Sequence, residues 1–413
     1  MKGILVVLDG LGDLPHTLLQ GKTPLEAARK PALNLLSGNA NLWYMYSVSE
    51  KFVPESDKGM LHILGKEKTL ISRGQLESIG AGIELKSGDL ALRANFGTVD
   101  PSNRKKIVDR RVGRTLTTKE AMLLAKSINK QVKLEHPFIF QPTVQHRGVL
   151  VMKGSFSENI SNTDPAYPKD GKFVGDDVKD AASLDESELS EYTAGQVNSF
   201  MMQSMEVLEK HFINNKRARK GELPANIILM RGAGAQLPKI QKFNKWAAFV
   251  YMPLEIGIAK TFGMKVFSFK YTLKSYSVYK SLRKLLKKAA KTAVKMIKKQ
   301  QKNFDYFYVH FKETDLPGHD NKPLEKKAMI ELLDKYFFSY LVKLAKKQEV
   351  KILVTGDHAT PCKLSSHSAD PVPVLYFDGK FTSSQSVNFC EKTCLERKQK
   401  VYGKYLLRKA GFV

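Results

Sequence analysis

The sequence predicts an α/β fold with a mostly parallel sheet that helices cover on both faces. Five near-continuous apolar runs have strand length, alternate with helical stretches and end in reactive polar residues. The runs and the residues after them are Gly3–Leu8 with Asp9, Ala225–Met230 with Arg231, Lys265–Phe269 with Lys270, Phe304–Phe311 with Lys312 and Asp315, and Lys351–Val354 with Asp357 and His358. Such runs indicate buried parallel strands. Ligands of these sheets bind beyond the carboxyl ends of the strands, so we expect an enzyme with its site there.

The remaining elements are predicted from periodicity and from helix-capping residues. A helix is expected near Leu25–Ser37. Strands at Ala91–Val99 and Gly148–Met152 flank a helix over Thr117–Asn129, with Thr117 as the N-cap. The segment Asn159–Glu191 is rich in Asp, Ser, Pro and Lys and is expected to be a long loop, and Ala194–Phe212 is a predicted helix. At 413 residues the chain is long enough for two domains.

The clearest periodic segment is Ser277–Gln300. Its apolar residues recur at steps of three and four and form one stripe: Leu282, Leu285, Leu286, Ala289, Ala293 and Ile297. Lysines occupy most of the remaining positions: Lys284, Lys287, Lys288, Lys291, Lys295, Lys298 and Lys299. We interpret this segment as a helix that covers the sheet and exposes a solvated face. A membrane-surface or RNA-binding helix is the alternative.

Composition restricts the class of protein. The net charge is +26, but lysine is spread over the whole chain and forms no nucleic-acid-binding motif, so we do not expect nucleic acid as a partner. No apolar run approaches the roughly 20 residues that span a bilayer, and the chain starts directly with a strand, which predicts a cytoplasmic protein without a membrane partner. The three cysteines are expected to be free thiols. The sequence does not determine the oligomeric state.

Histidines and aspartates gather after the predicted strands. Asp9 follows the first strand, Asp315 and His319 follow Phe304–Phe311, and Asp357, His358 and His367 follow Lys351–Val354. Carboxylates combined with imidazoles suit Mn²⁺, Zn²⁺, Co²⁺ or Fe²⁺, whereas carboxylates alone favour Mg²⁺ or Ca²⁺. Each motif alone is weakly specific. Together they supply enough ligands for two ions on one sheet edge, the arrangement that clamps both oxygens of a phosphoryl transfer.

Ser56 is the candidate nucleophile. It lies in a predicted turn, Pro54–Gly59, that opens into the apolar segment Met60–Leu64. A hydroxyl at this point could be deprotonated on a metal ion, with amides of a helix N-terminus holding a phosphate. The alternative is an ordinary helix N-cap.

The motifs resemble those of a known enzyme family. Asp9-Gly10, Ser56-Asp57, Thr314-Asp315-x3-His319, Gly356-Asp357-His358 and His367-Ser368 occur in the order found in the alkaline phosphatase superfamily. Further matching stretches are Gly21–Ala28, Arg73–Glu77, Leu92–Phe96, Asp109–Arg114, Thr163–Pro165 and Arg231–Gly234. With these, the chain resembles the archaeal-type 2,3-bisphosphoglycerate-independent phosphoglycerate mutases from its first strand to about Phe389.

The resemblance implies an alkaline-phosphatase-like fold with a smaller inserted α+β domain at residues 85–215, the catalytic domain being 1–84 plus 216–413. One ion would be held by Asp9, Ser56, Asp357 and His358, and the other by Asp315, His319 and His367. Ser56 would carry the phosphoryl group. The implied substrate-binding residues are Arg73, Arg93, Arg110, Arg111, Arg114, Asp164 and Arg231.

The implied activity is the interconversion of 3-phosphoglycerate and 2-phosphoglycerate in glycolysis and gluconeogenesis, without 2,3-bisphosphoglycerate. Mn²⁺ is the metal we expect, and Co²⁺, Zn²⁺ and Mg²⁺ are alternatives. Guanidinium groups suit the substrate because they bind carboxylate and phosphate bidentately. The nearest alternative is a metal-dependent phosphomonoesterase or a phosphopentose mutase on the same scaffold. A sulfatase-like hydrolase would need an oxidised Cys or Ser in its own motif, and none of the three cysteines lies near Ser56 in the sequence. A basic nucleic-acid-binding protein with an inactive site is the alternative of a different class.

Overall fold

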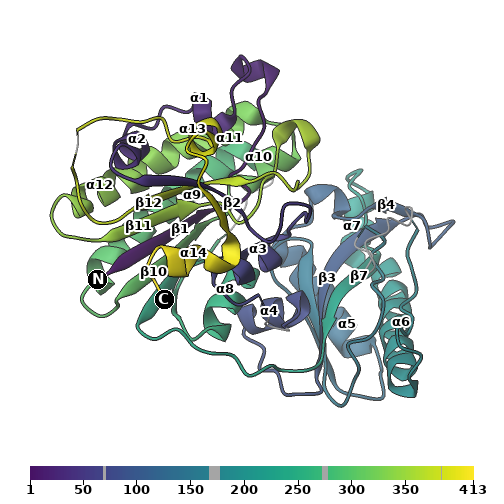
Figure 1. Cartoon of the computed structure of the whole chain (residues 1–413). Helices are drawn as coiled ribbons and strands as arrows, with labels where there is room; N and C mark the ends of the chain where they lie inside the picture. The colour runs from purple at the N-terminus through teal and green to yellow at the C-terminus, as the bar shows by residue number, and fades with distance from the viewer. Residues whose placement is uncertain (68–70, 167–176, 272–277, 383) are drawn as a thin grey trace. The chain divides into compact units, whose positions relative to one another are not determined.

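The computed structural model describes residues 1–67, 71–166, 177–271, 278–382 and 384–413 (Figure 1). By its internal contacts the chain forms two compact units. The first unit comprises residues 1–69, 241–251 and 262–413, and the second comprises 70–240 and 252–261. These contacts group residues 70–84 and 216–240 with the second unit, whereas the sequence assigns them to the catalytic domain. The predicted domain boundaries at residues 85 and 215 stay a prediction.

An eight-stranded, mostly parallel sheet forms the centre of the first unit (Figure 1). Its strands are β1 Gly3–Leu8, β2 Asn41–Tyr46, β8 Trp246–Phe249, β9 Lys265–Phe267, β10 Tyr306–Phe311, β11 Lys351–Thr355, β12 Val372–Phe377 and β13 Lys400–Tyr402, in the spatial order β13-β2-β12-β11-β1-β10-β8-β9. β1 is parallel to both of its neighbours, β10 and β11, and only the two pairings of β12 are antiparallel. Every residue of β1 is buried. The predicted parallel sheet is confirmed.

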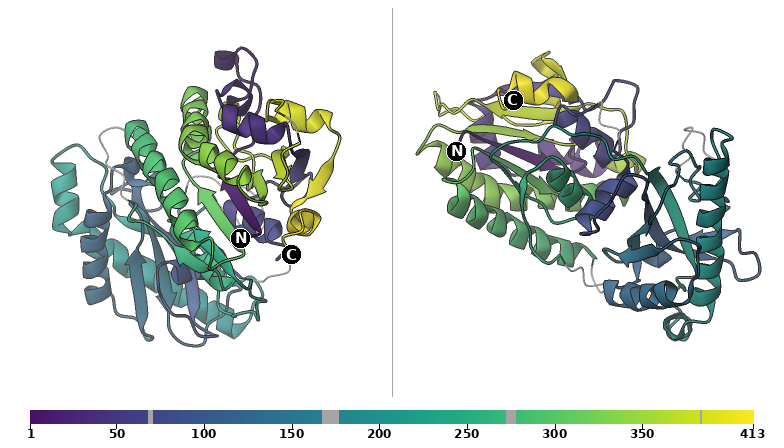
Figure 2. Two further views of the ribbon diagram at one scale, coloured as in Figure 1. Left: turned by 90° about the vertical axis from the view of Figure 1, so that its left-hand side faces the viewer. Right: turned by 90° about the horizontal axis from the view of Figure 1, so that it is seen from below.

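Helices cover this sheet on both faces, as predicted. In Figure 2 the green helices α9, α11 and α12 lie on one side of the sheet, and the yellow helix α14 lies on the other with α3. The helices of the first unit are α1 Pro24–Ala27, α2 Pro31–Ser37, α3 Ser56–Ile63, α9 Val278–Gln300, α10 Asp315–His319, α11 Pro323–Leu333, α12 Ser339–Ala345, α13 Glu391–Glu396 and α14 Gly403–Lys409, with a π-helical turn at Asp334–Phe338. None of the helices in the described part of the chain has the length and apolar character needed to cross a bilayer.

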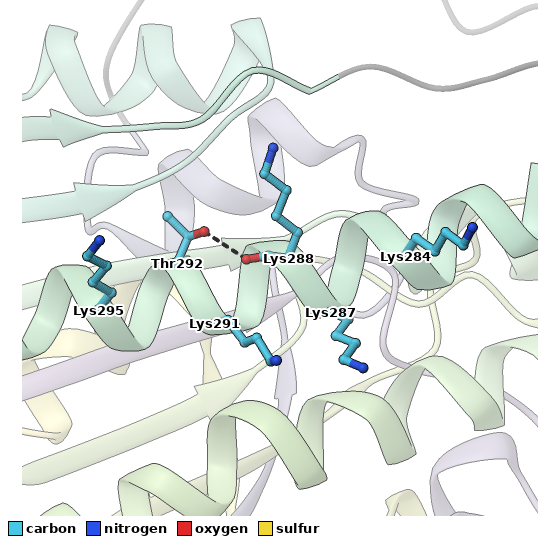
Figure 3. A pocket seen from close by; sticks show the side chains of 6 residues that line it. All are labelled: Lys284, Lys287, Lys288, Lys291, Thr292 and Lys295. Carbon is cyan, nitrogen blue, oxygen red and sulfur yellow. Dashed lines mark hydrogen bonds between the residues drawn. The ribbon is translucent and has the colours of Figure 1, made fainter.

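Helix α9 matches the predicted Ser277–Gln300 closely, although Ser277 lies outside the described residues. Its apolar stripe is buried apart from Leu285, which is half-buried. All of its lysines are exposed, and five of them project around the helix beside Thr292 (Figure 3). The ammonium groups of Lys287 and Lys291 lie 4.8 Å and 5.5 Å from the centre of the Tyr336 ring. The polar face is therefore solvated or packed on aromatic rings, as the sheet-covering interpretation requires.

The second unit is built on an antiparallel sheet. Its strands are β3 Leu90–Val99, β4 Ile107–Asp109, β5 Phe138–Pro142, β6 Arg147–Met152 and β7 Ile227–Gly234. β3 is the central strand, since it pairs with β4, β6 and β7. The helices are α4 Arg73–Gly80, α5 Thr118–Gln131, α6 Glu188–Glu209, α7 Phe212–Ala218 and α8 Pro253–Thr261. Apolar residues of α5 and α6 complete the core on one face of the sheet. This is the predicted smaller α+β arrangement.

Two predicted elements are wrong. Ala225–Met230 was expected in the parallel sheet, but it belongs to β7, which pairs antiparallel with β3 in the second unit. A continuous apolar run identifies a strand buried on both faces, and it does not identify the sheet. The predicted helix Leu25–Ser37 is divided, because α1 ends at Ala27 and α2 begins at Pro31. Proline lacks the N–H that would continue the helix and disfavours helical geometry in the preceding residue.

The other predicted helices, strands and loops differ from the observed ones only in the residues at which they begin or end. Thr117 caps α5 with the reciprocal bonds of a capping box to Glu120, and the strands predicted on either side of that helix are β3 and β6. The predicted loop Asn159–Glu191 gives way to α6 at Glu188, and its residues 167–176 lie outside the described residues. The predicted helix Ala194–Phe212 ends at Glu209, before α7.

Candidate active site

The carboxyl ends of three adjacent strands bring the predicted metal ligands together. β1 lies between β10 and β11, so Asp9, which follows β1, lies between the segments that begin at Lys312 and Gly356. The Thr314 hydroxyl donates to the Asp9 carbonyl oxygen at 2.6 Å, and the N–H of Gly10 donates to Asp357 Oδ1 at 3.0 Å. These bonds hold the three strand ends at one edge of the sheet, as parallel topology requires.

Ser56 is the first residue of α3, and Glu55 is its N-cap residue. The alternative of an ordinary N-cap at Ser56 is therefore wrong. Ser56 is buried, and its Oγ lies 3.1 Å from His358 Nε2. Helix α3 approaches the segment after β11 so closely that a Cβ on Gly59 would lie 2.3 Å from the carbonyl oxygen of Asp357. Glycine at this position allows the helix to present Ser56 to the site.

His358 stands at the centre of the site, and its tautomer follows from its neighbours. The single hydroxyl proton of Thr360 is donated to Asp315 Oδ1 at 2.8 Å, and the same hydroxyl lies 3.0 Å from His358 Nδ1. His358 Nδ1 must then carry the proton of that second bond. Its Nε2 lone pair faces Ser56, Asp9 Oδ1 at 3.3 Å and Asp357 Oδ2 at 3.5 Å.

Asp315, His319 and His367 form a second group beside His358. Asp315 and His319 are the two ends of α10, and His319 Nε2 lies 3.4 Å from Asp315 Oδ2. His367 Nε2 lies 3.8 Å from Asp315 Oδ1. The His367 ring lies 3.8 Å from the ring of His358 and 5.0 Å from that of His319, centre to centre. All seven predicted metal-site residues thus lie in one cluster.

Buried charge governs the pKa values of this cluster. Burial raises the pKa of Asp315, but three neighbouring histidines and Lys312 lower it further, so its pKa lies well below the usual range. Burial raises the pKa of Asp357 as well, but the neighbouring His358, His310 and Lys312 outweigh burial, and its pKa is lowered. Burial and His358 lower the pKa of His367 to about 4. The carboxylates are therefore ionised and His367 is neutral near pH 7.

The hydrogen bonds of these residues orient their lone pairs in a way that suits divalent cations. His367 Nδ1 donates to the carbonyl oxygen of Pro54 at 2.9 Å, so the Nε2 of the neutral ring turns a lone pair toward Asp315. His358 Nε2 likewise turns a lone pair toward Asp9 Oδ1. Asp357 Oδ2 is buried and accepts no hydrogen bond from the described residues. Lone pairs that converge on ionised, buried carboxylates repel one another unless a cation lies among them.

Two residues near the ligands were not predicted as part of the metal site. His310, inside β10, places Nε2 3.5 Å from Asp9 Oδ2, and its Nδ1 is 2.7 Å from the Tyr308 hydroxyl. The ammonium of Lys312 contacts Asp9 Oδ2, and burial lowers the pKa of this lysine. Ligands were predicted only after strand ends, and His310 precedes the end of its strand by one residue. A histidine within an otherwise apolar, buried strand was the signal that could have identified it.

The potential ligand atoms fall into two sets, each within 4.8 Å. One set is Asp315, His358 and His367, and the other is Asp9, His310 and Asp357. The sequence grouped His358 with Asp9, Ser56 and Asp357, and that division of ligands stays a prediction.

The predicted substrate-binding residues all lie in the second unit. Ile107, Val108 and the segment Asp109–Arg111 line a hollow of about 490 Å³ together with Arg114. Arg110 is bound by two bonds, of 2.9 Å and 2.7 Å, to the buried carboxylate of Asp164.

Arg73, Arg93 and Arg231 lie on the neighbouring elements α4, β3 and β7. Arg93 pairs across the sheet with Arg231, and both are buried. Glu77 accepts from Arg73 at 3.0 Å and is in contact with Arg93. Burial raises the pKa of Glu77, but these arginines outweigh it and the pKa is lowered. The structure therefore brings the seven residues into one unit, with Arg110 and Asp164 as a pair.

Comparisons with known proteins give the family. A family model described as 2,3-bisphosphoglycerate-independent phosphoglycerate mutase matches residues 39–214. Curated proteins with that name from Thermococcus gammatolerans and Aeropyrum pernix are each 36% identical, with coverage of 95% and 96% of this chain and 92% and 95% of theirs.

Solved structures agree in fold. The PH0037 protein from Pyrococcus horikoshii has a TM-score of 0.76 at 29% identity and covers 99% of this chain and 96% of its own. The cofactor-independent phosphoglycerate mutase from Thermoplasma acidophilum has a TM-score of 0.61 at 27% identity and covers 100% and 99%. The predicted family is thus confirmed: this chain belongs to the 2,3-bisphosphoglycerate-independent phosphoglycerate mutases.

Proposed function

We propose that this chain interconverts 3-phosphoglycerate and 2-phosphoglycerate through a phosphoserine at Ser56, without 2,3-bisphosphoglycerate. The observation that supports this mechanism best is the position of Ser56 Oγ, 3.1 Å from His358 Nε2 and beside two sets of carboxylate and imidazole ligands. A hydroxyl at a phosphoryl-transfer site is suited to covalent catalysis, which divides one transfer into two easier steps.

Two divalent ions would be held by Asp9, Ser56, Asp357, His358 and His310 on one side and by Asp315, His319 and His367 on the other. When bound, they would neutralise phosphate charge and favour the deprotonated serine. We expect Mn²⁺ or Co²⁺, because imidazoles make up a large share of the ligands. Zn²⁺ and Mg²⁺ are the alternatives.

In the first step Ser56 Oγ loses its proton and bonds to phosphorus as the ester bond to the glycerate oxygen breaks, and the released oxygen takes up a proton. In the second step the other hydroxyl of the same glycerate loses its proton and bonds to phosphorus, while the bond between phosphorus and Ser56 Oγ breaks and Oγ takes up a proton. Arg111 and Arg114 are suited to hold the glycerate between these steps, because guanidinium groups bind carboxylates bidentately. Retention of glycerate and exclusion of water separate a mutase from a phosphatase.

A coupled assay tests the proposal. The protein is incubated with 3-phosphoglycerate and Mn²⁺ without 2,3-bisphosphoglycerate, and both 2-phosphoglycerate and free phosphate are measured. We expect 2-phosphoglycerate with little free phosphate. Free phosphate without 2-phosphoglycerate would favour the phosphomonoesterase alternative. The proposal fails if Mn²⁺, Co²⁺, Zn²⁺ and Mg²⁺ all leave phosphoglycerate unchanged.

A further inference from the structure

A buried lysine connects the two loops that carry metal-site residues. Lys326 lies on α11 and its side chain is completely buried. Its ammonium donates to Asp13 Oδ2 at 2.7 Å, to the carbonyl oxygen of Thr360 at 3.0 Å and to that of Gly12 at 3.3 Å. An ammonium has three N–H donors, so these three acceptors use all of them.

The acceptors belong to different strand ends. Gly12 and Asp13 lie on the loop that begins with Asp9 after β1, and Thr360 follows His358 after β11. Asp13 extends the link, because its Oδ1 accepts from the N–H of Cys362 at 3.0 Å. The N–H of Thr360 also donates directly to the Gly12 carbonyl at 3.0 Å. Lys326 therefore joins the two loops that carry Asp9 and His358.

Thr360 transmits this link to the ligands. Its backbone carbonyl binds Lys326, and its hydroxyl contacts both Asp315 Oδ1 and His358 Nδ1. A displacement of the Thr360 backbone would therefore move the group that sets the tautomer of His358 and orients Asp315. Helix α10 is similarly constrained, since a Cβ on Gly318 would lie 2.4 Å from the Thr360 carbonyl oxygen.

Stability alone is a poor reason for such an ion pair. Apolar residues of similar volume are often equally or more stabilising than a buried pair of charges. The Lys326–Asp13 pair is nearly neutral as a unit, so it adds little net charge to the nearby cation sites. Its distinctive property is geometric, because it holds two loops in one fixed register.

We propose that Lys326, with Asp13, is a positioning residue that presets the metal ligands, and that its loss weakens metal binding without a direct effect on substrate contacts. The proposal rests on the metal site of the proposed function. Groups that hydrogen-bond the ligands directly, as Thr360 does, change metal affinity by about 10- to 100-fold. Lys326 acts one contact further out, through Thr360.

The test uses the double variant Lys326→Met with Asp13→Asn. This variant removes both charges together, so the net charge is unchanged and neither buried partner keeps an uncompensated charge. Asparagine also retains an oxygen for the N–H of Cys362. Lys327→Met is the matched control: Lys327 is the next residue of α11 and forms a longer, partly exposed pair with Glu331 at 3.7 Å.

Mn²⁺ affinity is measured by calorimetry on the chelated full-length proteins, together with Mn²⁺ release into excess chelator, kcat and KM. Unfolding in EDTA establishes that each variant is folded. We expect the double variant to bind Mn²⁺ about tenfold more weakly, the lower end of the range for direct partners of the ligands, and to release it faster. We expect a reduced kcat and a KM for phosphoglycerate within about twofold at saturating Mn²⁺. The control should match the parent.

A folded double variant with the parent's Mn²⁺ affinity and release rate would overturn the proposal. If the double variant does not fold, Asp13→Asn alone decides, because it leaves Lys326 bound to two carbonyls and should weaken Mn²⁺ binding to a smaller but measurable extent. Unchanged affinity in that variant would equally overturn it. A parent protein and control that bind no Mn²⁺ would instead refute the proposed metal site.

Discussion

Ser56 owes its expected reactivity to its surroundings. It is buried at the start of α3, and the tautomer imposed on His358 by Thr360 leaves an Nε2 lone pair toward the hydroxyl. A serine hydroxyl is a weak nucleophile unless a neighbouring base or metal removes its proton. The site has a histidine beside the hydroxyl and carboxylate and imidazole groups that would hold a metal.

Ser56→Ala is expected to lower turnover by several orders of magnitude and to leave the fold intact, because covalent catalysis needs the hydroxyl. Ser37→Ala is the matched control, since Ser37 is equally buried but lies on α2. Acid quenching of the parent during turnover should trap phosphate on Ser56, which mass spectrometry can locate. Turnover near the parent level in Ser56→Ala would contradict the mechanism.

The arginines of the segment Asp109–Arg114 differ in their environments. Arg110 binds the buried carboxylate of Asp164 with both arms of its guanidinium, and Arg111 and Arg114 line the same hollow. Removal of Arg110 would leave a buried charge uncompensated, and its effect would mix stability with binding. Arg111 and Arg114 line the hollow, so their variants are used to test substrate binding.

Arg114→Ala is expected to raise KM for phosphoglycerate by roughly 10- to 150-fold, the value of a lost bond to a charged ligand. It should also raise the ratio of free phosphate to mutase product, because loosely held glycerate lets water reach the phosphoserine. Lysine should not restore the parent values, since ammonium lacks the planar fork. Arg104→Ala is the control, because Arg104 forms an exposed ion pair with Glu209 in the same unit. An unchanged KM and product ratio would place substrate binding elsewhere.

At the scale of elements, the central strands β1, β10 and β11 and the edge strand β9 could be predicted, whereas β2, β8, β12 and β13 were not. β1, β10 and β11 are continuous apolar runs because both of their faces are buried. β2, β12 and β13 are more irregular: β12 contains Pro373, and β2 mixes exposed and buried positions. β7 could be recognised as a strand but was assigned to the wrong sheet, since pairing partners are not encoded in an apolar run.

Helix α3 positions Ser56 through one close contact. The Cβ that alanine would add at Gly59 meets the Asp357 carbonyl oxygen at 2.3 Å, and backbone cannot give way as a flexible side chain can. Gly59→Ala is therefore expected to destabilise the fold by about 1–3 kcal/mol and to lower kcat by displacing Ser56.

Gly195→Ala is the control for this prediction. Gly195 lies inside α6, and a Cβ there meets nothing within 4 Å. Alanine in such a helix position should stabilise by roughly 0.5–1 kcal/mol. Chemical unfolding of the two variants, with kcat measured in parallel, checks the pair. Parent-like stability and activity in Gly59→Ala would mean that α3 can move away from β11 without cost.

At the scale of the whole molecule, the active site is assembled from segments that are far apart in the sequence. Asp9, Asp315 and Asp357 converge because parallel strands place their carboxyl ends at one edge, and helix α3 presents Ser56 to them. This convergence, with the family, could be predicted from the order of the motifs. His310 could not be predicted from strand ends, and the division of ligands between two ions depends on distances that spacing along the chain does not give.

The residues that give the chain its net charge of +26 are spread along the sequence and, unlike the active-site residues, do not gather at one site. The strongly basic helix α9 carries exposed lysines around its polar face (Figure 3). The ammonium groups of Lys287, Lys288 and Lys298 lie over the rings of Tyr336, Phe269 and Tyr340. The exposed face lacks the apolar anchors of a membrane-surface helix, because the apolar stripe is turned inward. Nucleic-acid binding stays untested.

Metal removal should affect activity and stability together, because the ligands come from three strand ends of one sheet. EDTA is expected to abolish turnover and to lower the unfolding temperature, since ions that bind only the folded state stabilise it by about 2.7 kcal/mol at 100 times Kd. Mn²⁺ or Co²⁺ should restore both better than Mg²⁺, because three of the seven predicted ligands are imidazoles.

Asp315→Asn, which removes a carboxylate charge from the second set of ligands, should bind less metal by elemental analysis and should show a smaller stabilisation by Mn²⁺ than the parent. Full activity after exhaustive chelation, with no metal found by elemental analysis, would refute the site. Loss of activity without any change in unfolding temperature would mean instead that the carboxylates at the sheet edge tolerate one another without a cation, and that Lys312 and the neighbouring histidines neutralise them in the folded protein.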